Sequence, residues 1–144
     1  MPSKTTRNID NMTQADLDQV AALWEAAEMW PHVGEDRAWL EHALARNPGC
    51  ALVWRDRGSV MGTVIGAWDG LRGWIYRLVV AEDCRAEGIG TALLAAAEAG
   101  LREAGVEQIN LMVYDQNPAA EAFYRHRGYQ RSPVKVLRKR FRTS

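Results

Sequence analysis

A glycine-bearing stretch in the middle of the chain has the residue types of an anion-binding site. It runs from Leu78 to Leu94 with the sequence L-V-V-A-E-D-C-R-A-E-G-I-G-T-A-L-L. A strand-like run ends here, a loop follows and a helix-favouring run begins, so the loop presents backbone N–H groups at the positive end of a helix dipole. Gly88 and Gly90 let an oxyanion approach the backbone, and Arg85 adds a guanidinium fork. The pattern predicts a phosphate or pyrophosphate site.

Two common phosphate-binding motifs do not fit this stretch. The dinucleotide fingerprint G-x-G-x-x-G needs glycine where Leu93 stands, and the P-loop needs G-K-[ST], which is absent. The residues alone leave two alternatives: an anion site of another class, or a glycine-rich helix entry without a ligand. Cys50 and Cys84, the only cysteines, show no metal-ligand spacing, and we expect no metal.

Two segments together resemble the GNAT superfamily of N-acetyltransferases. R-A-E-G-I-G (Arg85–Gly90) matches the superfamily's acetyl-CoA signature R/Q-x-x-G-x-G/A. Further along, N-P-A-A-E-A-F-Y-R-H-R-G-Y (Asn117–Tyr129) is similar to its second motif, N-x-x-A-x-x-F-Y-x-x-x-G-F/Y. The order of elements along the whole chain also fits, and D-G-L-R-G-W-I-Y-R-L-V-V resembles small bacterial members of the YpeA type.

The resemblance implies roles for particular residues. Leu78, Val79 and Val80 would lie along the pantetheine arm of acetyl-CoA, with their backbone pairing with its amides as a β-strand would. Asn117 would bond the pantetheine, and Tyr124 would sit beside the thioester sulfur. The pyrophosphate would be bound by Arg85, Ala86, Glu87, Gly88, Ile89, Gly90 and Thr91. Taken singly, Asn117 is typical of a turn or helix cap and Tyr124 of an amphipathic core position.

Amine acetylation by such a site needs a neutral nitrogen and a route for its proton. An amine like that of Lys has a pKa of about 10.4, so about one molecule in 2,500 is neutral at pH 7. The backbone N–H of Val80 is a candidate donor to the oxyanion formed by direct attack on the thioester. Tyr124 is the candidate general acid for the departing thiolate. The acyl group, acetyl or longer, is left open.

The general base is not identified by the sequence. Many superfamily members carry a Glu near the strand that precedes the glycine loop, whereas Tyr76 and Arg77 occupy that region here. Asp69, Glu82, His32 or a chain of waters remain alternatives. Cys84 is an alternative as a nucleophile for a ping-pong reaction, although a small loop residue is the simpler interpretation.

Composition predicts one soluble domain. The chain has 144 residues, of which 47% are hydrophobic and 25% charged, and we expect a single N-acetyltransferase domain over residues 1–144. Neither a membrane-spanning run nor the apolar core of a secretory signal is found. With two cysteines, a cytoplasmic location is expected.

Periodicity predicts an α/β (α+β) fold: a mixed, mostly antiparallel sheet flanked by about four helices, in the order β-α-α-β-β-β-α-β-α-β. The expected strands cover residues 7–11, 50–55, 60–68, 74–80, 108–114 and 134–141; the expected helices cover 17–29, 35–46, 88–104 and 118–127. T-Q-A-D at Thr13–Asp16 resembles a capping box. The second helix is expected to bury Ala38, Trp39, Ala43 and Leu44.

The two predicted N-terminal helices also indicate the kind of amine that the site accepts. Trp24 and Trp39 are interpreted as core residues, and Trp30 in the connecting loop as the pocket candidate. Eight acids and one base between Asp10 and Glu41 favour a cationic amine, either a small molecule or a peptide.

The same residues leave one alternative function and give expectations about partners. The alternative function is a non-catalytic acyl-CoA-binding or sensor module on the same fold, favoured by the missing central Glu. R-K-R-F-R near the end suggests nucleic acid, but in a chain of zero net charge this is not favoured. No membrane partner is expected, and a homodimer stays open.

Overall fold

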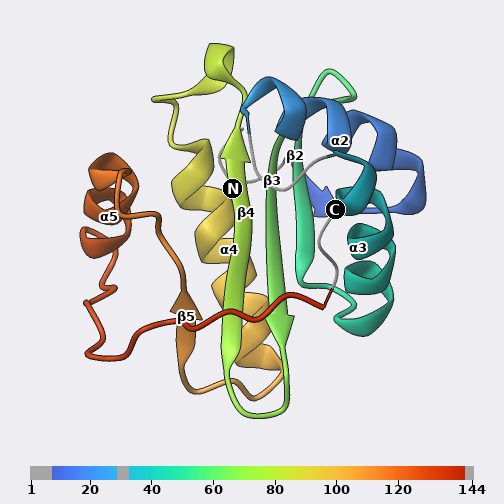
Figure 1. Ribbon diagram of the computed structural model, residues 1–144. Coiled ribbons are helices and arrows are strands. Elements are labelled where there is room, and N and C mark those ends of the chain that lie inside the picture. The colour runs from blue at the N-terminus through green and yellow to red at the C-terminus, as the bar shows by residue number, and fades with distance from the viewer. Residues whose placement is uncertain (1–7, 29–32, 142–144) are drawn as a thin grey trace. The chain divides into compact units, whose positions relative to one another are not determined.

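The computed structural model describes residues 8–28 and 33–141 (Figure 1). The chain forms two compact units that divide after Met112, and each is described by itself. The predictions for Trp30 and His32 concern residues outside these described ranges.

The first unit is built on a five-stranded sheet in the order β1-β2-β3-β4-β5. Its strands are β1 (Ile9–Asn11), β2 (Ala51–Asp56), β3 (Ser59–Trp68), β4 (Gly73–Val80) and β5 (Ile109–Leu111). The first four strands pair antiparallel and β4 pairs parallel with β5, so the sheet is mixed and mostly antiparallel, as expected. β5 is shorter than the strand predicted over 108–114.

Helices cover both faces of this sheet. One face carries α4 (Ile89–Glu103), whose Ile89, Leu93 and Leu101 approach the β3 glycines Gly62 and Gly66 closely. A Cβ at Gly62 would stand 3.0 Å from Leu93, so glycine lets the helix lie against the strand. α2 (Leu17–Ala26) and α3 (Val33–Arg46) contact β3 as well and pack over the opposite face. In Figure 1 the central strands run between the yellow α4 and the blue and teal α2 and α3.

The core under α2 and α3 corrects one expectation from the sequence. In α3 the fully buried residue is Leu40, with Ala43 and Leu44 half-buried beside it. Ala38 is exposed and Trp39 is 38% exposed, so the expected burial of these two is wrong. The helix is rotated so that the i, i+3, i+4 set beginning at Leu40 faces the sheet.

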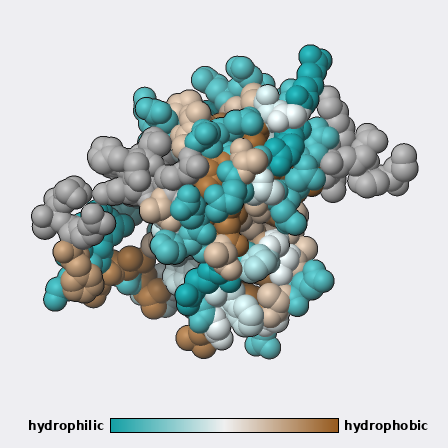
Figure 2. Space-filling model, turned by 90° about the vertical axis from the view of Figure 1, so that its right-hand side faces the viewer, coloured by the Kyte–Doolittle hydropathy of each residue, from teal (hydrophilic) through white to brown (hydrophobic). Residues whose placement is uncertain are grey.

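On the face turned to the viewer in Figure 2, hydrophilic residues dominate and apolar residues show as smaller patches between them.

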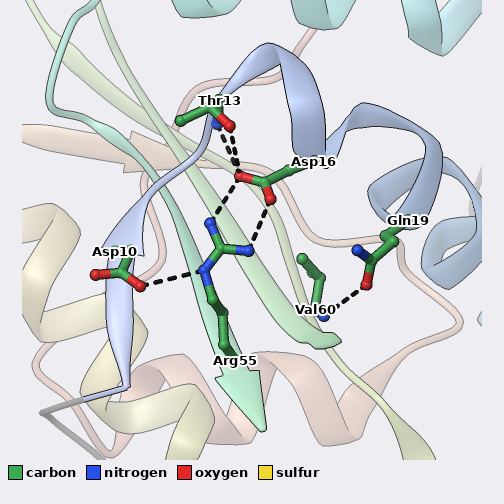
Figure 3. A network of polar contacts seen from close by, with 6 residues as sticks. All are labelled: Asp10, Thr13, Asp16, Gln19, Arg55 and Val60. Atoms are coloured by element: carbon green, nitrogen blue, oxygen red, sulfur yellow. Dashed lines mark hydrogen bonds and ion pairs between the residues drawn. The ribbon is translucent and has the colours of Figure 1, made fainter. Parts of the chain in front are cut away.

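A buried ion pair ties the start of the chain to β2. The guanidinium of Arg55 donates two hydrogen bonds to Asp16, at 2.7 and 3.0 Å, and one of 3.1 Å to Asp10 (Figure 3). Asp16 also accepts from the backbone N–H and hydroxyl of Thr13, which confirms the capping box at the 3₁₀ turn η1 (Gln14–Asp16). Hydrogen bonding to Arg55 is the main reason that the pKa of Asp16 is lowered.

The second unit contains one helix and a long extended tail. α5 (Pro118–Arg125) begins at Pro118, a residue preorganised for a first helical position, and Gly128 follows it with φ +95°. The strand predicted over 134–141 is wrong, since this segment forms no strand and its Val134, Leu137 and Phe141 are largely exposed. A strand needs a neighbour to satisfy its backbone, and apolar alternation alone does not supply one.

Candidate active site

The predicted anion loop connects the end of β4 to the start of α4. The 3₁₀ turn η2 (Glu82–Cys84) follows β4, and residues 85–88 lead into the helix. Ala86 has φ +69° and Gly88 has φ +81°. A left-handed residue followed by a right-handed one, as at Gly88 and the helical Ile89, turns successive N–H groups into one concavity. The helix adds its first N–H groups, which have no acceptors within the helix. The chain therefore has here the geometry that holds an oxyanion.

The loop's side chains are arranged around this backbone. Arg85 is exposed, and its Nε donates 3.0 Å to the carbonyl of Val80, which fixes the loop to the end of β4. Open space surrounds the Cα of Gly88, so glycine is required there by its φ angle and not by a close neighbour. Glu87 is exposed, Ile89 is buried against the sheet, and Gly90 and Thr91 form the first turn of α4.

The later half of β4 has no strand partner on its β5 side among the described residues. β4 pairs with β5 only from Gly73 to Ile75, and further along β4 the pairing to β5 ceases. Leu78, Val79 and Val80 lie in this later half, just before the anion loop. An unpaired strand edge offers alternating N–H and C=O groups, which an extended amide-containing ligand can join.

A β-bulge lies at the same place. Tyr76 pairs with Ile65 and Val79 with Thr63, so Arg77 and Leu78 together oppose a single residue of β3. Arg77 has φ +55°, a left-handed conformation that non-glycine residues rarely adopt. The bulge re-aims the backbone amides that follow it, including those of Val79 and Val80.

A buried relay of hydrogen bonds reaches this bulge. The indole N–H of Trp24 donates 2.9 Å to the hydroxyl of Thr63, which donates 2.9 Å to the carbonyl of Arg77. Trp24 and Thr63 are both 0% exposed, and the Arg77 guanidinium lies 4.9 Å from the centre of the Trp24 ring. Trp24 is thus a core residue, as predicted. Sequence reasoning missed Thr63, although a hydroxyl amid the apolar run of β3 signals a buried group that needs a partner.

The candidates for the general base differ in their surroundings. Asp69 lies in the turn between β3 and β4, at the opposite end of β4 from Val80. Its carboxylate accepts from the N–H groups of Leu71 and Arg72, which lower its pKa and make it a weaker base. Glu82 is exposed and lies in η2, directly after β4.

Cys84 has the properties of a structural residue. Its side chain is buried, and burial followed by nearby carboxylates raises the pKa of the thiol. A nucleophilic cysteine needs the opposite, a lowered pKa in an electropositive site. Cys84 therefore lacks the properties of a ping-pong nucleophile.

Asn117 and Tyr124 lie on α5 in the second unit. The side-chain oxygen of Asn117 accepts 3.1 Å from the N–H of Ala120, so the residue is the N-cap, and its amide Nδ2 carries the donors. Tyr124 packs edge-on against Phe123 and Tyr129, and burial raises the pKa of its phenol to about 12. The structure thus brings residues 78–91 together in the first unit, and Asn117 with Tyr124 on one helix in the second.

Comparison with known proteins places this geometry in a family. The model of the Acetyltransferase (GNAT) family matches residues 11–129, which is most of the chain. The chain belongs to the GNAT family of acetyltransferases. It is 32% identical over 127 residues to an acetyltransferase of Yersinia enterocolitica, covering 88% of this chain and 90% of that protein.

Solved structures of the family share the fold. A ribosomal-protein-alanine N-acetyltransferase from Brucella melitensis is 27% identical with a TM-score of 0.69, covering 83% of this chain and 82% of its own. An aminoglycoside N-acetyltransferase solved in complex with CoA is 14% identical with a TM-score of 0.77, covering 92% and 93%. Family membership and these relatives identify the protein as an acyltransferase.

Two further findings concern metal ions and membranes. Within residues 8–28 and 33–141, no three His, Cys, Asp or Glu side chains gather where they could hold a metal ion. Over the same residues, no helix has the length and hydropathy to cross a membrane.

Proposed function

We propose that this GNAT protein transfers the acetyl group of acetyl-CoA to a primary amine by direct attack on the thioester. The observation that carries the proposal is the junction of three features at one end of β4: an open strand edge, a bulge, and the nest of N–H groups leading into α4. Together they fit the pantetheine, the thioester carbonyl and the pyrophosphate of one ligand. Residues 1–144 would act as one domain in the cytoplasm.

Each part of the cofactor is assigned to its own set of residues. The pyrophosphate would be bound by Arg85, Ala86, Glu87, Gly88, Ile89, Gly90 and Thr91, chiefly through their backbone. The pantetheine amides would pair with Leu78, Val79 and Val80 and accept from Asn117. The N–H of Val80, which follows the bulge, would donate to the carbonyl oxygen as it becomes an oxyanion.

The reaction forms a C–N bond and breaks the C–S bond. The neutral amine attacks the thioester carbon, and the oxyanion collapses to an amide and the thiolate of CoA. The proton lost by nitrogen passes to solvent directly or through Glu82, which is exposed beside this end of β4. Tyr124 would donate to the sulfur as negative charge develops on it.

The raised pKa of Tyr124 suits a donor more than a base. With a pKa of about 12 the phenol keeps its proton at every physiological pH. A thiol has a pKa of about 8.5, so complete transfer from this phenol is uphill unless a second proton replaces the first. The nitrogen of the tetrahedral intermediate carries such a proton. Tyr124 is therefore assigned as the general acid, which donates to the leaving sulfur while a proton from nitrogen or solvent replaces its own.

The acceptor is assigned as a positively charged amine. The structural relatives include enzymes named for a protein amine and for aminoglycosides, so the fold accommodates both kinds of acceptor. Acidic residues on and beside α2, among them Asp18 and Glu25, are exposed and favour a cation.

A thiol-release assay tests the function. Purified protein with acetyl-CoA is screened against polyamines, amino acids, aminoglycosides and peptides, and the acetylated product is confirmed by mass. We expect CoA release that depends on both acetyl-CoA and an amine. Tight acetyl-CoA binding by calorimetry without turnover on any amine would overturn the catalytic assignment in favour of a sensor module.

A further inference from the structure

Aromatic rings from α3 and β4 form a continuous surface in the first unit. The ring of Trp39 meets that of Tyr76 edge-on, with centroids 5.8 Å apart, and Tyr76 stacks with Trp74 at 6.4 Å. Trp39 is 38% exposed, and Tyr76 and Trp74 are half-buried. We call Trp39, Tyr76 and Trp74 the aromatic wall. The wall begins one residue before the bulge at Arg77 and runs back along β4 toward the β3–β4 turn.

A carboxylate lies at the far end of this wall. Oδ2 of Asp69 accepts 3.3 Å from the indole N–H of Trp74, while Oδ1 accepts from two backbone N–H groups of the turn. The negative charge of Asp69 reaches Tyr76 as well, since it adds to burial in raising the pKa of that phenol. Asp69 is exposed and held in place by these hydrogen bonds.

The fold already uses one ring of this neighbourhood to bind a cation. Trp24 stands 6.4 Å from Trp39, and its ring carries the guanidinium of Arg77 at 4.9 Å. Arg77 therefore occupies the ring of Trp24, whereas the rings of the wall are partly exposed and the Asp69 carboxylate is bonded to Trp74 at one end of it. Aromatic faces together with a carboxylate are the combination that selects alkylammonium groups.

A cation held on this wall cannot be the nitrogen that is acetylated. The attacking nitrogen must be neutral, and aromatic faces and a carboxylate stabilise the ammonium form instead. We propose that the aromatic wall and Asp69 bind a second, protonated nitrogen of the acceptor, so that the preferred acceptor is a small di- or polyamine. This rests on the proposed function, because it identifies the acceptor of that same site.

The strand register gives the spacing of the two nitrogens. Val80 pairs with Gly62 and Tyr76 with Ile65, so the oxyanion donor and the nearest ring of the wall are three β3 residues apart. At about 3.3 Å per residue, this separation is on the order of 10 Å. Trp74 pairs with Ala67, two residues further on, where a longer polyamine would bring a third nitrogen toward Asp69.

The test compares amines that differ only in their second nitrogen. Hexamethylenediamine and n-heptylamine have the same length, and the diamine replaces a terminal methyl group with an ammonium group. We expect kcat/KM to be at least about tenfold higher for the diamine, and the advantage to be greatest for diamines whose nitrogens lie roughly 10 Å apart. Trp74→Leu and Asp69→Asn should each lower this ratio of kcat/KM values several-fold. Asp69→Asn keeps Oδ1 for the turn.

Matched controls are available in the same unit. Trp68 is as exposed as Trp39, at 38%, but lies beside the turn residues Leu71 and Arg72 in a separate surface depression. Glu103 is an exposed carboxylate at the end of α4. Trp68→Leu and Glu103→Gln should leave the diamine-to-monoamine ratio unchanged.

The outcomes separate this proposal from the proposed function. Turnover of n-heptylamine with no diamine advantage at any chain length, or an advantage that survives both Trp74→Leu and Asp69→Asn, would overturn the second-nitrogen site and leave the acetyltransferase intact. If no amine is acetylated, calorimetric titration with hexamethylenediamine still decides: binding that Trp74→Leu weakens supports the site, and absence of binding refutes it.

Discussion

The hydroxyl of Thr63 donates a 2.9 Å hydrogen bond to the carbonyl oxygen of Arg77, the residue at which β4 bulges. Thr63 in turn accepts from the buried indole of Trp24. The left-handed conformation of Arg77 costs about 1–3 kcal/mol and persists where its surroundings fix it. Thr63 is the side chain from the neighbouring strand that bonds to this carbonyl, and we expect it to orient the amides of Val79 and Val80.

Replacing Thr63 by Val should lower kcat more than it weakens acetyl-CoA binding. The isosteric change removes the donor to Arg77 and the acceptor for Trp24, both in a buried place, at a cost of about 1–3 kcal/mol in the free energy of unfolding. Steady-state kinetics and calorimetry of the folded variant measure the two effects. Thr63→Ser retains the hydroxyl and should recover most of kcat. Equal kcat for Val and Ser variants would contradict the positioning role.

Gly90→Glu should weaken acetyl-CoA binding at least about tenfold, or about 1.4 kcal/mol. The substitution places a negative charge in the first turn of α4, where the pyrophosphate is proposed to bind. Ala95→Glu is the control, because it adds the same charge on an exposed position of the same helix. Calorimetry on both folded variants provides the comparison, and equal affinities would remove the pyrophosphate from this loop.

Asn117→Ser separates the two roles of Asn117. Serine caps helices about as well as asparagine, so α5 should keep its stability to within about 0.5 kcal/mol. The amide donors to the pantetheine are lost, and KM for acetyl-CoA should rise several-fold. Asn117→Ala, which removes the cap as well, should also lower the melting temperature. An unchanged KM in the serine variant would leave Asn117 as a cap alone.

The Arg55–Asp16 pair should make the free energy of unfolding depend on pH in the acidic range. The pKa of Asp16 is lowered below its ordinary value of 3.8 by its hydrogen bonds to Arg55, so the pair contributes above that value and is lost as the pH falls through the lower, folded-state pKa. Asp16→Ala should cost about 2–4 kcal/mol at pH 7, because it leaves a partly buried guanidinium without this partner.

Glu121 and Arg131 provide the matched exposed pair. They are 3.1 Å apart with side chains 34% and 77% exposed, so Glu121→Ala should cost at most about 1 kcal/mol. Urea unfolding of both variants between pH 2.5 and 7 measures the contrast. A pH-independent loss in Asp16→Ala relative to the parent protein would contradict the linkage.

Local patterns predicted most of the elements. These patterns act within a few residues of their own position. The structure has a turn at the loop glycines, a capping box at Thr13 and Asp16, and a helix start at Pro118. The segment 134–141 has strand-like alternation, but whether it forms a strand depends on a partner elsewhere in the chain. Its exposed Leu137 and Phe141 show that alternation was not sufficient.

The sequence motifs of the candidate site can be read from the sequence, whereas the strand register and buried contacts around it cannot. The bulge at Arg77 arises from the register of β4 against β3, and the Trp24–Thr63 contact joins residues 39 apart in the sequence. The helical spacing of Trp39 predicts a core position, whereas in the structure Leu40 is the residue of α3 that faces the core. Such pairings depend on tertiary geometry, which a periodic pattern does not contain.

Tyr124→Phe should lower kcat by about 10²–10⁴ with little change in acetyl-CoA affinity, since the hydrogen bond to sulfur strengthens only as the thiolate departs. The phenylalanine ring keeps the edge-on contacts with Phe123 and Tyr129, so the melting temperature should barely move. Phe123→Leu, which alters the ring packing and leaves the phenol, is the comparison for a purely structural effect.

The pH dependence gives an independent check on the same residue. Burial raises the pKa of the Tyr124 phenol to about 12, so the proton that it donates is retained well above the ordinary value of 10.0. The parent enzyme should therefore gain kcat/KM with rising pH as more of the acceptor amine becomes neutral, and show no decline from this group up to about pH 11. A falling limb near pH 10 that Tyr124→Phe abolishes would show a phenol of ordinary acidity. A wild-type kcat in the phenylalanine variant would instead make Tyr124 structural and require water to protonate the thiolate.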